Sequence, residues 1–388
     1  MNENLLPHPL GPAEIRAYID FDSVGSSRSG DSSQAILQSR GVAALWQLLQ
    51  NNGYAYLGDE VGMGKTRQAM GVIATQFLSD PNSHVVIVCP GETLQRQWVR
   101  EWDAFIRGCY LAKENRLSSA WDGSMLQGLA FHNRLRDFAQ SLLLNENRIH
   151  LLRYSAFSRP IWFGNADPKK KVAEQVNDVI SEYTSCLREI GIPQPTAYEN
   201  SIFQKFVASH GDGWREEITS LLNEAYAQRV GQLLKARDID LVIFDEAQYL
   251  RHIDNRQNTN IRHVFRKHAA KWLFMSATPL HTGVHDIASL DNYLCMHEDG
   301  NDAVKKCPAC GNTKCTKARF QLKGKIDVVE ILKGFLVRRN RNYQDATQKL
   351  YGKVEYRKYN RSKVAASGDP FRSEEPTSEL QSRQVNSY

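Results

Sequence analysis

The chain has 388 residues, 41% of them hydrophobic, which is long enough for two or three domains with buried cores. It contains no apolar run of about 18 residues, so the sequence offers no candidate for a transmembrane helix. The N-terminus lacks the basic and apolar segments of a secretory signal, and a cytoplasmic location is the default expectation. Seven cysteines are too few and too unevenly spaced for a disulfide scaffold.

The net charge of +6 is distributed unevenly along the chain. Residues 301–363 contain 17 Lys and Arg against 5 Asp and Glu, a surplus of 12, so the remainder sums to −6. A basic C-terminal third favours a polyanionic partner, most simply nucleic acid, although a solvated basic surface explains the charge equally well.

Hydrophobic periodicity outlines the elements in chain order. Residues 1–33 are polar and rich in Ser and Gly, and we expect an irregular lead-in there. Residues 34–50 carry apolar side chains at helical spacing. Five apolar runs of strand length then alternate with helical segments: YAYLG, HVVIVCP, RIHLLRYS, LVIFDEA and KWLFMSA. This alternation indicates an α/β fold with a parallel sheet flanked by helices.

Residues 159–236 break the alternation. They show helical periodicity without an intervening strand, so we interpret them as a helical insertion in the sheet domain. Support of the fold is one role for such an insertion, and contact with a partner is the other.

The stretch LGDEVGMGKT is typical of a phosphate-binding loop between a strand and a helix. Gly62 and Gly64 permit close approach of the backbone to phosphate, and the helix N-terminus adds a favourable dipole. Lys65 can reach the β- and γ-phosphates, and the Thr66 hydroxyl can bind Mg²⁺. One position departs from the simple pattern, because Asp59 stands where the first glycine is expected.

Two further motifs follow strands. In LVIFDEAQYL, Asp245 and Glu246 come at the end of a strand, which places two carboxylates near the loop in an open parallel sheet. Asp245 can hold Mg²⁺ and Glu246 can orient and polarise the attacking water. In FMSATPL, the small hydroxyls of Ser276 and Thr278 can sense the γ-phosphate.

The order of these motifs resembles the superfamily-two helicases and translocases, most closely the Swi/Snf-type ATPases and their RapA-like relatives. Their loop, A-D-E-x-G-x-G-K-T, accommodates Asp59 in register. The resemblance implies a RecA-like ATP-binding lobe that tracks nucleic acid, most simply double-stranded DNA. It also implies that Gln38, in QSRGV, reads adenine. The implied nucleotide-binding residues are Gln38, Asp59, Glu60, Val61, Gly62, Met63, Gly64, Lys65 and Thr66.

Other segments extend the resemblance. VVIVCPGETLQRQWVREW is similar to the strand and Trp-bearing helix of the family, LLRYSAF to the segment after it, and ILKGFLVRRNRN to the segment that leads out of the first lobe. Gln248 replaces the common His of the D-E-x-H motif, which we expect to weaken the coupling between ATP and nucleic acid.

The resemblance ends after one lobe. No stretch resembles the second RecA-like lobe, which carries the arginine fingers of the family, so we expect slow ATP hydrolysis by this chain alone. RSEEPTSELQSR, in the tail 364–388, looks like a translated sequencing-adapter oligonucleotide, and the alternative is a polar disordered tail.

A cysteine cluster, CPACGNTKC, has zinc-knuckle spacing. Cys307, Cys310 and Cys315 supply three thiolates, and Cys295 or His297 is the candidate fourth ligand. Free reduced thiols in a polar loop are the alternative. The remaining cysteines, Cys89, Cys109 and Cys186, and the pair Trp98 and Trp102 are expected to pack in or near the core.

These observations predict the ATP-binding lobe of a duplex-DNA translocase that uses ATP and Mg²⁺ and carries a structural Zn²⁺. A non-catalytic nucleotide- or nucleic-acid-binding module and an RNA helicase are the alternatives. The predicted units are a lead-in (1–33), a RecA-like lobe (34–158 and 237–300), a helical insertion open to protein partners (159–236), a zinc knuckle (301–320), a basic segment (321–363) and a tail (364–388).

Overall fold

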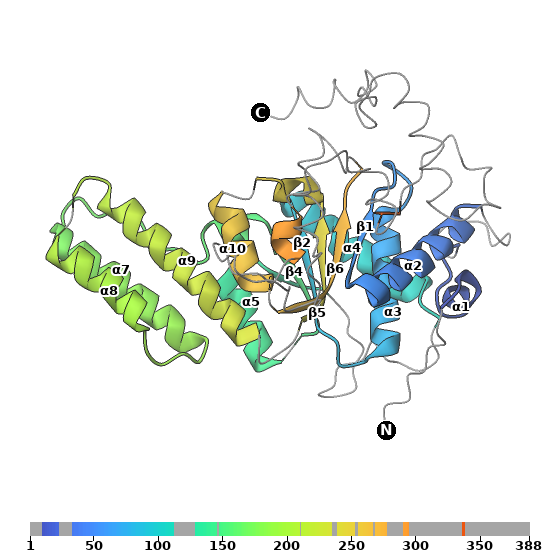
Figure 1. The fold of residues 1–388 in the computed structure, drawn as a ribbon, viewed down its shortest axis with the longest axis horizontal. Coiled ribbons are helices and arrows are strands. Elements are labelled where there is room, and N and C mark those ends of the chain that lie inside the picture. Colours follow the sequence, from blue (N-terminus) through green and yellow to red (C-terminus); the bar gives the residue numbers. More distant parts are fainter. Residues whose placement is uncertain are drawn as a thin grey trace, which may run out of the picture.

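The computed structural model describes residues 10–22, 33–111, 129–145, 147–209, 211–234, 239–252, 255–266, 268–277, 290–294 and 336–337. Seven parallel strands form one sheet in the order β3-β4-β2-β5-β6-β1-β7 (Figure 1). The strands are β1 (Tyr54–Leu57), β2 (Val85–Cys89), β3 (Ala130–His132), β4 (Ile149–Arg153), β5 (Ile239–Asp245), β6 (Ala269–Met275) and β7 (Leu336–Val337). The prediction of a parallel α/β sheet is confirmed.

Helices cover both faces of the sheet, because the central strands alternate two sets of apolar side chains. On β2, Val85, Ile87 and Cys89 face one core and Val86 and Val88 face the other. The first core packs against α1 (Pro12–Tyr18), α2 (Ser33–Asn52), α3 (Lys65–Ser79) and α4 (Glu92–Gly108). The second packs against α5 (Leu135–Leu144), α6 (Ser155–Ser158), α10 (Arg256–Phe265) and part of α9 (Trp214–Leu234).

The expectation of an irregular lead-in over residues 1–33 was wrong for part of that range. Residues 12–18 form α1, with Pro12 in the first turn, where its missing N–H costs no hydrogen bond. Ile15 and Ile19 are each 1% exposed, and both belong to the core that α2 also lines. Burial against α2 stabilises a helix that is too short to form alone.

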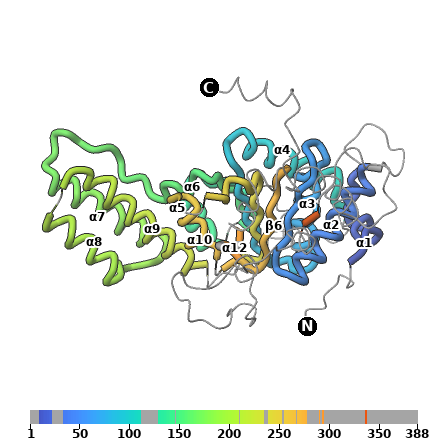
Figure 2. The backbone as a smooth tube through the Cα atoms, turned by 45° about the horizontal axis from the view of Figure 1, so that its top comes forward, coloured from blue at the N-terminus to red at the C-terminus, as the bar shows by residue number. Residues whose placement is uncertain are grey.

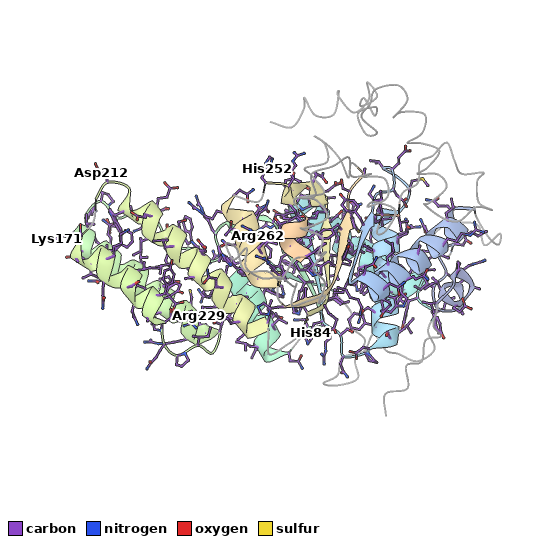
Figure 3. The ribbon with its side chains drawn as sticks, viewed as in Figure 1. His84, Lys171, Asp212, Arg229, His252 and Arg262 are labelled. Atoms are coloured by element: carbon purple, nitrogen blue, oxygen red, sulfur yellow. The ribbon has the colours of Figure 1, made fainter. Side chains whose placement is uncertain are left out.

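Between β4 and β5, the described residues form helices and no strand. After α6, the helices α7 (Val172–Glu189), α8 (Ala197–Ala208) and α9 form an arm that projects from one side of the sheet (Figures 1 and 2). Lys171 and Asp212 lie at its outer end (Figure 3).

A buried carboxylate holds the arm together. Glu199 of α8 accepts hydrogen bonds from the Tyr183 hydroxyl of α7 (2.6 Å) and from Arg229 Nε of α9 (3.0 Å). It also completes a capping box with Thr196. The Glu199 side chain thus connects all three helices and caps the N-terminus of α8.

Two short helices complete the described structure, η1 (Ala247–Leu250), a single 3₁₀ turn directly after β5, and α12 (Asp291–Leu294). None of the described helices is long and apolar enough to cross a membrane.

Candidate nucleotide-binding site

The loop after β1 has the backbone shape that phosphate binding requires. Gly62 and Gly64 have φ of +83° and +79°, a left-handed conformation that glycine adopts without steric cost. Gly64 is the N-cap residue of α3, so the loop delivers its backbone directly to a helix N-terminus. The turn is closed by Met63 N–H, which donates to the Glu60 carbonyl at 3.2 Å.

Lys65 begins α3 and turns its ammonium group back over the loop. Its Nζ donates to the Asp59 carbonyl at 2.7 Å and to the Glu60 carbonyl at 3.3 Å. Thr66, the next residue, is partly exposed in the first turn of the same helix. A positive charge and a hydroxyl therefore lie at the helix N-terminus that the loop creates.

Asp59, the departure from the simple loop pattern, is fully buried. Its Oδ2 accepts a hydrogen bond from Gln68 Nε2 at 2.9 Å, which ties the start of the loop to the second turn of α3. The sequence reasoning did not select Gln68. The sequence does indicate that Gln68 faces the loop, because it follows Lys65 by three residues and therefore lies on the same side of α3.

Gln38 reaches the loop from α2 and is 2% exposed. Its amide lies directly over Gly64, because a Cβ atom at Gly64 would come within 2.2 Å of Gln38 Nε2. The structure thus brings Gln38 to the phosphate loop. Its reading of adenine stays a prediction.

Asp245 is the last residue of β5 and Glu246 follows it, at the same edge of the sheet as the loop. Asp245 pairs in register with Met275 of β6, which pairs with Leu57 of β1. Two strand spacings, roughly 10 Å, therefore separate the backbones of Asp245 and Leu57. The predicted acidic pair and the predicted phosphate loop lie together at the carboxyl edge of one parallel sheet, where open α/β sheets bind their ligands.

The Asp245 carboxylate is held at both oxygens. Trp98 Nε1 donates to Oδ2 at 2.8 Å, and the Glu246 backbone N–H donates to Oδ1 at 3.0 Å. Burial raises the pKa of Asp245 to about 6, and the charge of Glu246 acts in the same direction, whereas the Trp98 hydrogen bond and the charge of Lys65 oppose it. The Tyr154 hydroxyl donates to the Asp245 carbonyl at 3.1 Å.

Glu246 adopts an unusual backbone conformation, with φ of 52° and ψ of 55°. This left-handed residue turns the chain from β5 into η1. Its Oε2 accepts a hydrogen bond from Gln248 Nε2 at 2.9 Å, so the predicted coupling residue contacts the predicted water-activating residue directly.

Ser276 follows β6 and is fully buried. Its backbone N–H donates to the Leu57 carbonyl at 3.1 Å, which connects the end of β6 to the start of the phosphate loop. The other predicted sensor of the γ-phosphate, Thr278, lies outside the described residues.

The predicted zinc ligands Cys295, Cys307, Cys310 and Cys315, with the alternative His297, also lie outside the described residues, and zinc binding stays a prediction. Within the described part of the chain, no group of three or more His, Cys, Asp or Glu side chains could hold a metal ion. Cys89, Cys109 and Cys186 are buried free thiols, as predicted, and Trp98 and Trp102 are buried as well.

The donor set fits a hard cation. The Thr66 hydroxyl and the Asp245 carboxylate carry oxygen donors of the kind that Mg²⁺ prefers, and their binding of Mg²⁺ stays a prediction. The buried, doubly hydrogen-bonded Asp245 carboxylate is oriented before any ligand arrives.

A strand, a glycine loop and a helix, with an acidic pair at the same edge of a parallel sheet, define the class of phosphate-loop nucleotide-binding proteins. Comparison with known families identifies the family within this class. Residues 37–357 match the SNF2-related domain, and the chain belongs to that family, as the sequence resemblance predicted.

Proteins that are similar to this chain include one plant protein and one archaeal protein of solved structure. A segment of 64 residues, 16% of this chain, is 39% identical to Protein CHROMATIN REMODELING 8 of Arabidopsis thaliana and spans 5% of that protein. The solved Sulfolobus solfataricus SWI2/SNF2 ATPase core in complex with dsDNA is 13% identical, with a TM-score of 0.39. That match covers 78% of this chain and 44% of the archaeal chain.

Proposed function

We propose that this chain is the ATP-binding lobe of a translocase that moves along double-stranded DNA, and that ATP and Mg²⁺ bind at its phosphate loop. One observation carries the proposal: the left-handed glycine loop and the acidic pair occur at one edge of the same sheet. Membership of the SNF2-related family supports an ATPase. The surplus of 12 basic residues over 301–363 supports a polyanionic partner, for which duplex DNA is our candidate.

Each residue then has a role. The backbone around Gly62 and Gly64 and the Lys65 ammonium would bind the phosphates. Thr66 and Asp245 would hold Mg²⁺, which when bound neutralises charge that develops on the transferred phosphate. Glu246 would orient and polarise the attacking water, and its hydrogen bond to Gln248 would connect it to the predicted coupling residue.

Nucleotide binding is tested by Gly64→Ala, with Gly91→Ala as the matched control. A methyl group at Gly64 would approach Gln38 Nε2 to 2.2 Å in a left-handed backbone. At Gly91, which is extended, the same position has no atom within 4 Å apart from those of the adjoining residues. Titration with a fluorescent ATP analogue should show at least a ~10-fold weaker affinity for Gly64→Ala, since the left-handed conformation alone costs about 1–2 kcal/mol for alanine. Equal affinities of the two variants would contradict a phosphate loop.

The nucleic-acid partner is tested by comparing duplex DNA with duplex and single-stranded RNA of equal length, each with and without a Mg²⁺–ATP analogue. We expect the nucleotide to change the affinity for duplex DNA, because two coupled sites alter each other reciprocally. Stronger coupling to RNA would favour an RNA helicase. Nucleotide binding with no coupling to any nucleic acid would favour the non-catalytic module.

A further inference from the structure

Trp98 connects α4 to the acidic pair through one buried hydrogen bond. The residue lies in the second turn of α4, and its ring is 1% exposed. Its indole Nε1–H donates to Asp245 Oδ2 at 2.8 Å, across 147 residues of sequence. The carboxylate has two oxygens, and the other accepts the backbone N–H of Glu246 at 3.0 Å. The two hydrogen bonds together fix the orientation of the group.

Trp102, one turn further along the same helix, provides an internal comparison. It is also fully buried, and its ring stacks on Phe105 with centroids 5.9 Å apart. However, Trp102 Nε1 has no hydrogen-bond partner in the described structure. Two tryptophans on one helix face are therefore equally packed, and of these two only Trp98 directs its N–H at a site residue.

Packing alone does not explain the choice of tryptophan at position 98. A phenylalanine would fill much of the same apolar space without a buried N–H that needs a partner. The indole N–H instead meets a buried carboxylate, and hydrogen bonds to charged groups are the stronger ones. This bond also spans from the helix after β2 to the end of β5, the neighbouring strand.

We propose that Trp98 is a positioning residue for Mg²⁺ binding, holding the Asp245 carboxylate in the orientation that the metal requires. The proposal rests on the proposed function, because it assigns Mg²⁺ to Asp245. Hydrogen bonds from residues around metal ligands commonly determine ligand orientation, and their loss weakens metal affinity roughly 10- to 100-fold. Trp98 does not touch the metal or the nucleotide in this proposal.

The test compares Trp98→Phe with Trp102→Phe. Both variants remove the same atoms from a buried ring on the same helix, so the loss of packing is matched. Binding of a fluorescent ATP analogue is titrated with Mg²⁺. For Trp98→Phe the Mg²⁺ concentration at half-saturation should rise roughly 10- to 100-fold, whereas Trp102→Phe should stay within about twofold of the wild type. Binding of the analogue in EDTA should be unchanged in both variants.

A second readout uses the unaltered protein. With ¹⁵N-labelled tryptophan, the indole resonance of Trp98 is identified by its absence from the spectrum of Trp98→Phe. Addition of Mg²⁺ with the nucleotide should shift this resonance, while that of Trp102 moves much less. This measurement does not depend on turnover, and thermal unfolding of both variants checks that each remains folded.

The outcomes separate the two proposals. A wild-type chain that binds no nucleotide contradicts the proposed function and removes this inference with it. A wild-type chain that binds Mg²⁺ and nucleotide, with Trp98→Phe and Trp102→Phe showing the same Mg²⁺ dependence or with a stationary Trp98 resonance, overturns the positioning role alone.

Discussion

At the scale of single residues, the backbone of Glu246 is under strain. It is one of two non-glycine residues with positive φ in the described structure, the other being Asn145 at a helix C-terminus. Asparagine is commonly tolerated in this conformation, but glutamate is not. Such strain costs about 1–3 kcal/mol and persists where the surrounding structure imposes it, often at functional sites.

Substitutions at Glu246 should separate this strain from the loss of the carboxylate. Glu246→Gly and Glu246→Ala both remove the carboxylate and its hydrogen bond to Gln248. The glycine variant should nevertheless have the higher free energy of unfolding, by about 0.5–1 kcal/mol. Alanine is destabilised by the left-handed backbone, whereas glycine is destabilised only by the greater conformational entropy of its unfolded chain, which is the smaller effect. Urea unfolding measures the difference.

The same pair of substitutions at Glu182, inside α7, provides the control. There both variants lose the ion pair with Arg136. The free energy of unfolding of Glu182→Gly should be lower than that of Glu182→Ala by about 1 kcal/mol, as in any helix interior. An Ala variant that is more stable than the Gly variant at position 246 would show that the backbone there is not strained.

The sequence predicted those site residues that can be recognised from the residues next to them in the chain. Gly62, Gly64 and Lys65 lie within one loop, and Asp245 follows directly from an apolar strand, so their placement needs only neighbouring residues. The contact of Trp98 with Asp245 was missed. It joins residues 147 positions apart, and the helical spacing of Trp98 and Trp102 indicates burial without showing which indole N–H meets a carboxylate.

At the scale of elements, α9 and α10 approach unusually closely at Gly231. A Cβ atom there would lie 2.2 Å from the backbone carbonyl oxygen of His263 and 3.4 Å from the ring of His268. Next to this contact, His263 Nε2 and Glu224 Oε1 lie 3.1 Å apart and link the same two helices. The arm therefore joins the sheet domain through a backbone contact that a side chain would prevent.

Gly231→Ala should destabilise the protein, although alanine is ordinarily the better helix former by about 1 kcal/mol. The added methyl group meets backbone, which cannot rotate away, and overpacking of this kind costs typically 1–3 kcal/mol. Gly211→Ala is the matched control, because a methyl group there meets open space. Because the methyl group would meet a backbone oxygen at 2.2 Å, we expect the upper part of that range, about 2–3 kcal/mol, which leaves a net loss of about 1–2 kcal/mol after the gain in helix propensity. In urea unfolding, Gly231→Ala should therefore be less stable than Gly211→Ala by about 1–2 kcal/mol, and equal stabilities would contradict the close packing of α9 on α10.

Sequence patterning predicted the long elements and missed the short ones. The central strands and the helix at 34–50 have enough apolar residues to establish a period. β3 has three residues and α1 has seven, and neither is long enough to show one. Burial against β4 and α2 stabilises them, and that burial exists only in the folded chain.

At the scale of the whole molecule, one end of the sheet buries histidines that the proposed chemistry does not use. His132 of β3 and His150 of β4 approach within 3.1 Å, between Nε2 and Nδ1, and Phe138 of α5 packs on both rings. Burial lowers the pKa of His132 to about 4, against the opposing charge of Asp137. Burial also lowers the pKa of His150 well below its usual value, and the neighbouring His132 and His84 act in the same direction. His84 lies at the opposite edge of the sheet from His252, which is exposed after η1 (Figure 3).

We expect this arrangement to make the stability of the fold sensitive to acid. Above the pKa of an unfolded histidine, about 6.5, both states are neutral and His132 contributes no pH dependence. Between that value and about 4, the unfolded chain binds a proton that the folded chain rejects, so stability falls as the pH falls. If both rings were charged, two donors would face each other at 3.1 Å. The contribution of Asp245 has the opposite sign, because its pKa is raised in the folded chain and its contribution to stability therefore grows as the pH falls. Every variant compared below retains Asp245, so this contribution cancels in the comparison.

His132→Gln should therefore reduce the loss of stability between pH 7 and pH 5. For His132 alone that loss is about 2 kcal/mol, since each unit between the pH and the unfolded pKa contributes about 1.4 kcal/mol. Urea unfolding of the wild type, His132→Gln and His252→Gln at both pH values measures it. The exposed control His252→Gln should lose as much as the wild type. If His132→Gln also lost the same amount, the buried pair would titrate equally in the folded and unfolded chains, and the acid sensitivity would have to arise elsewhere in the molecule.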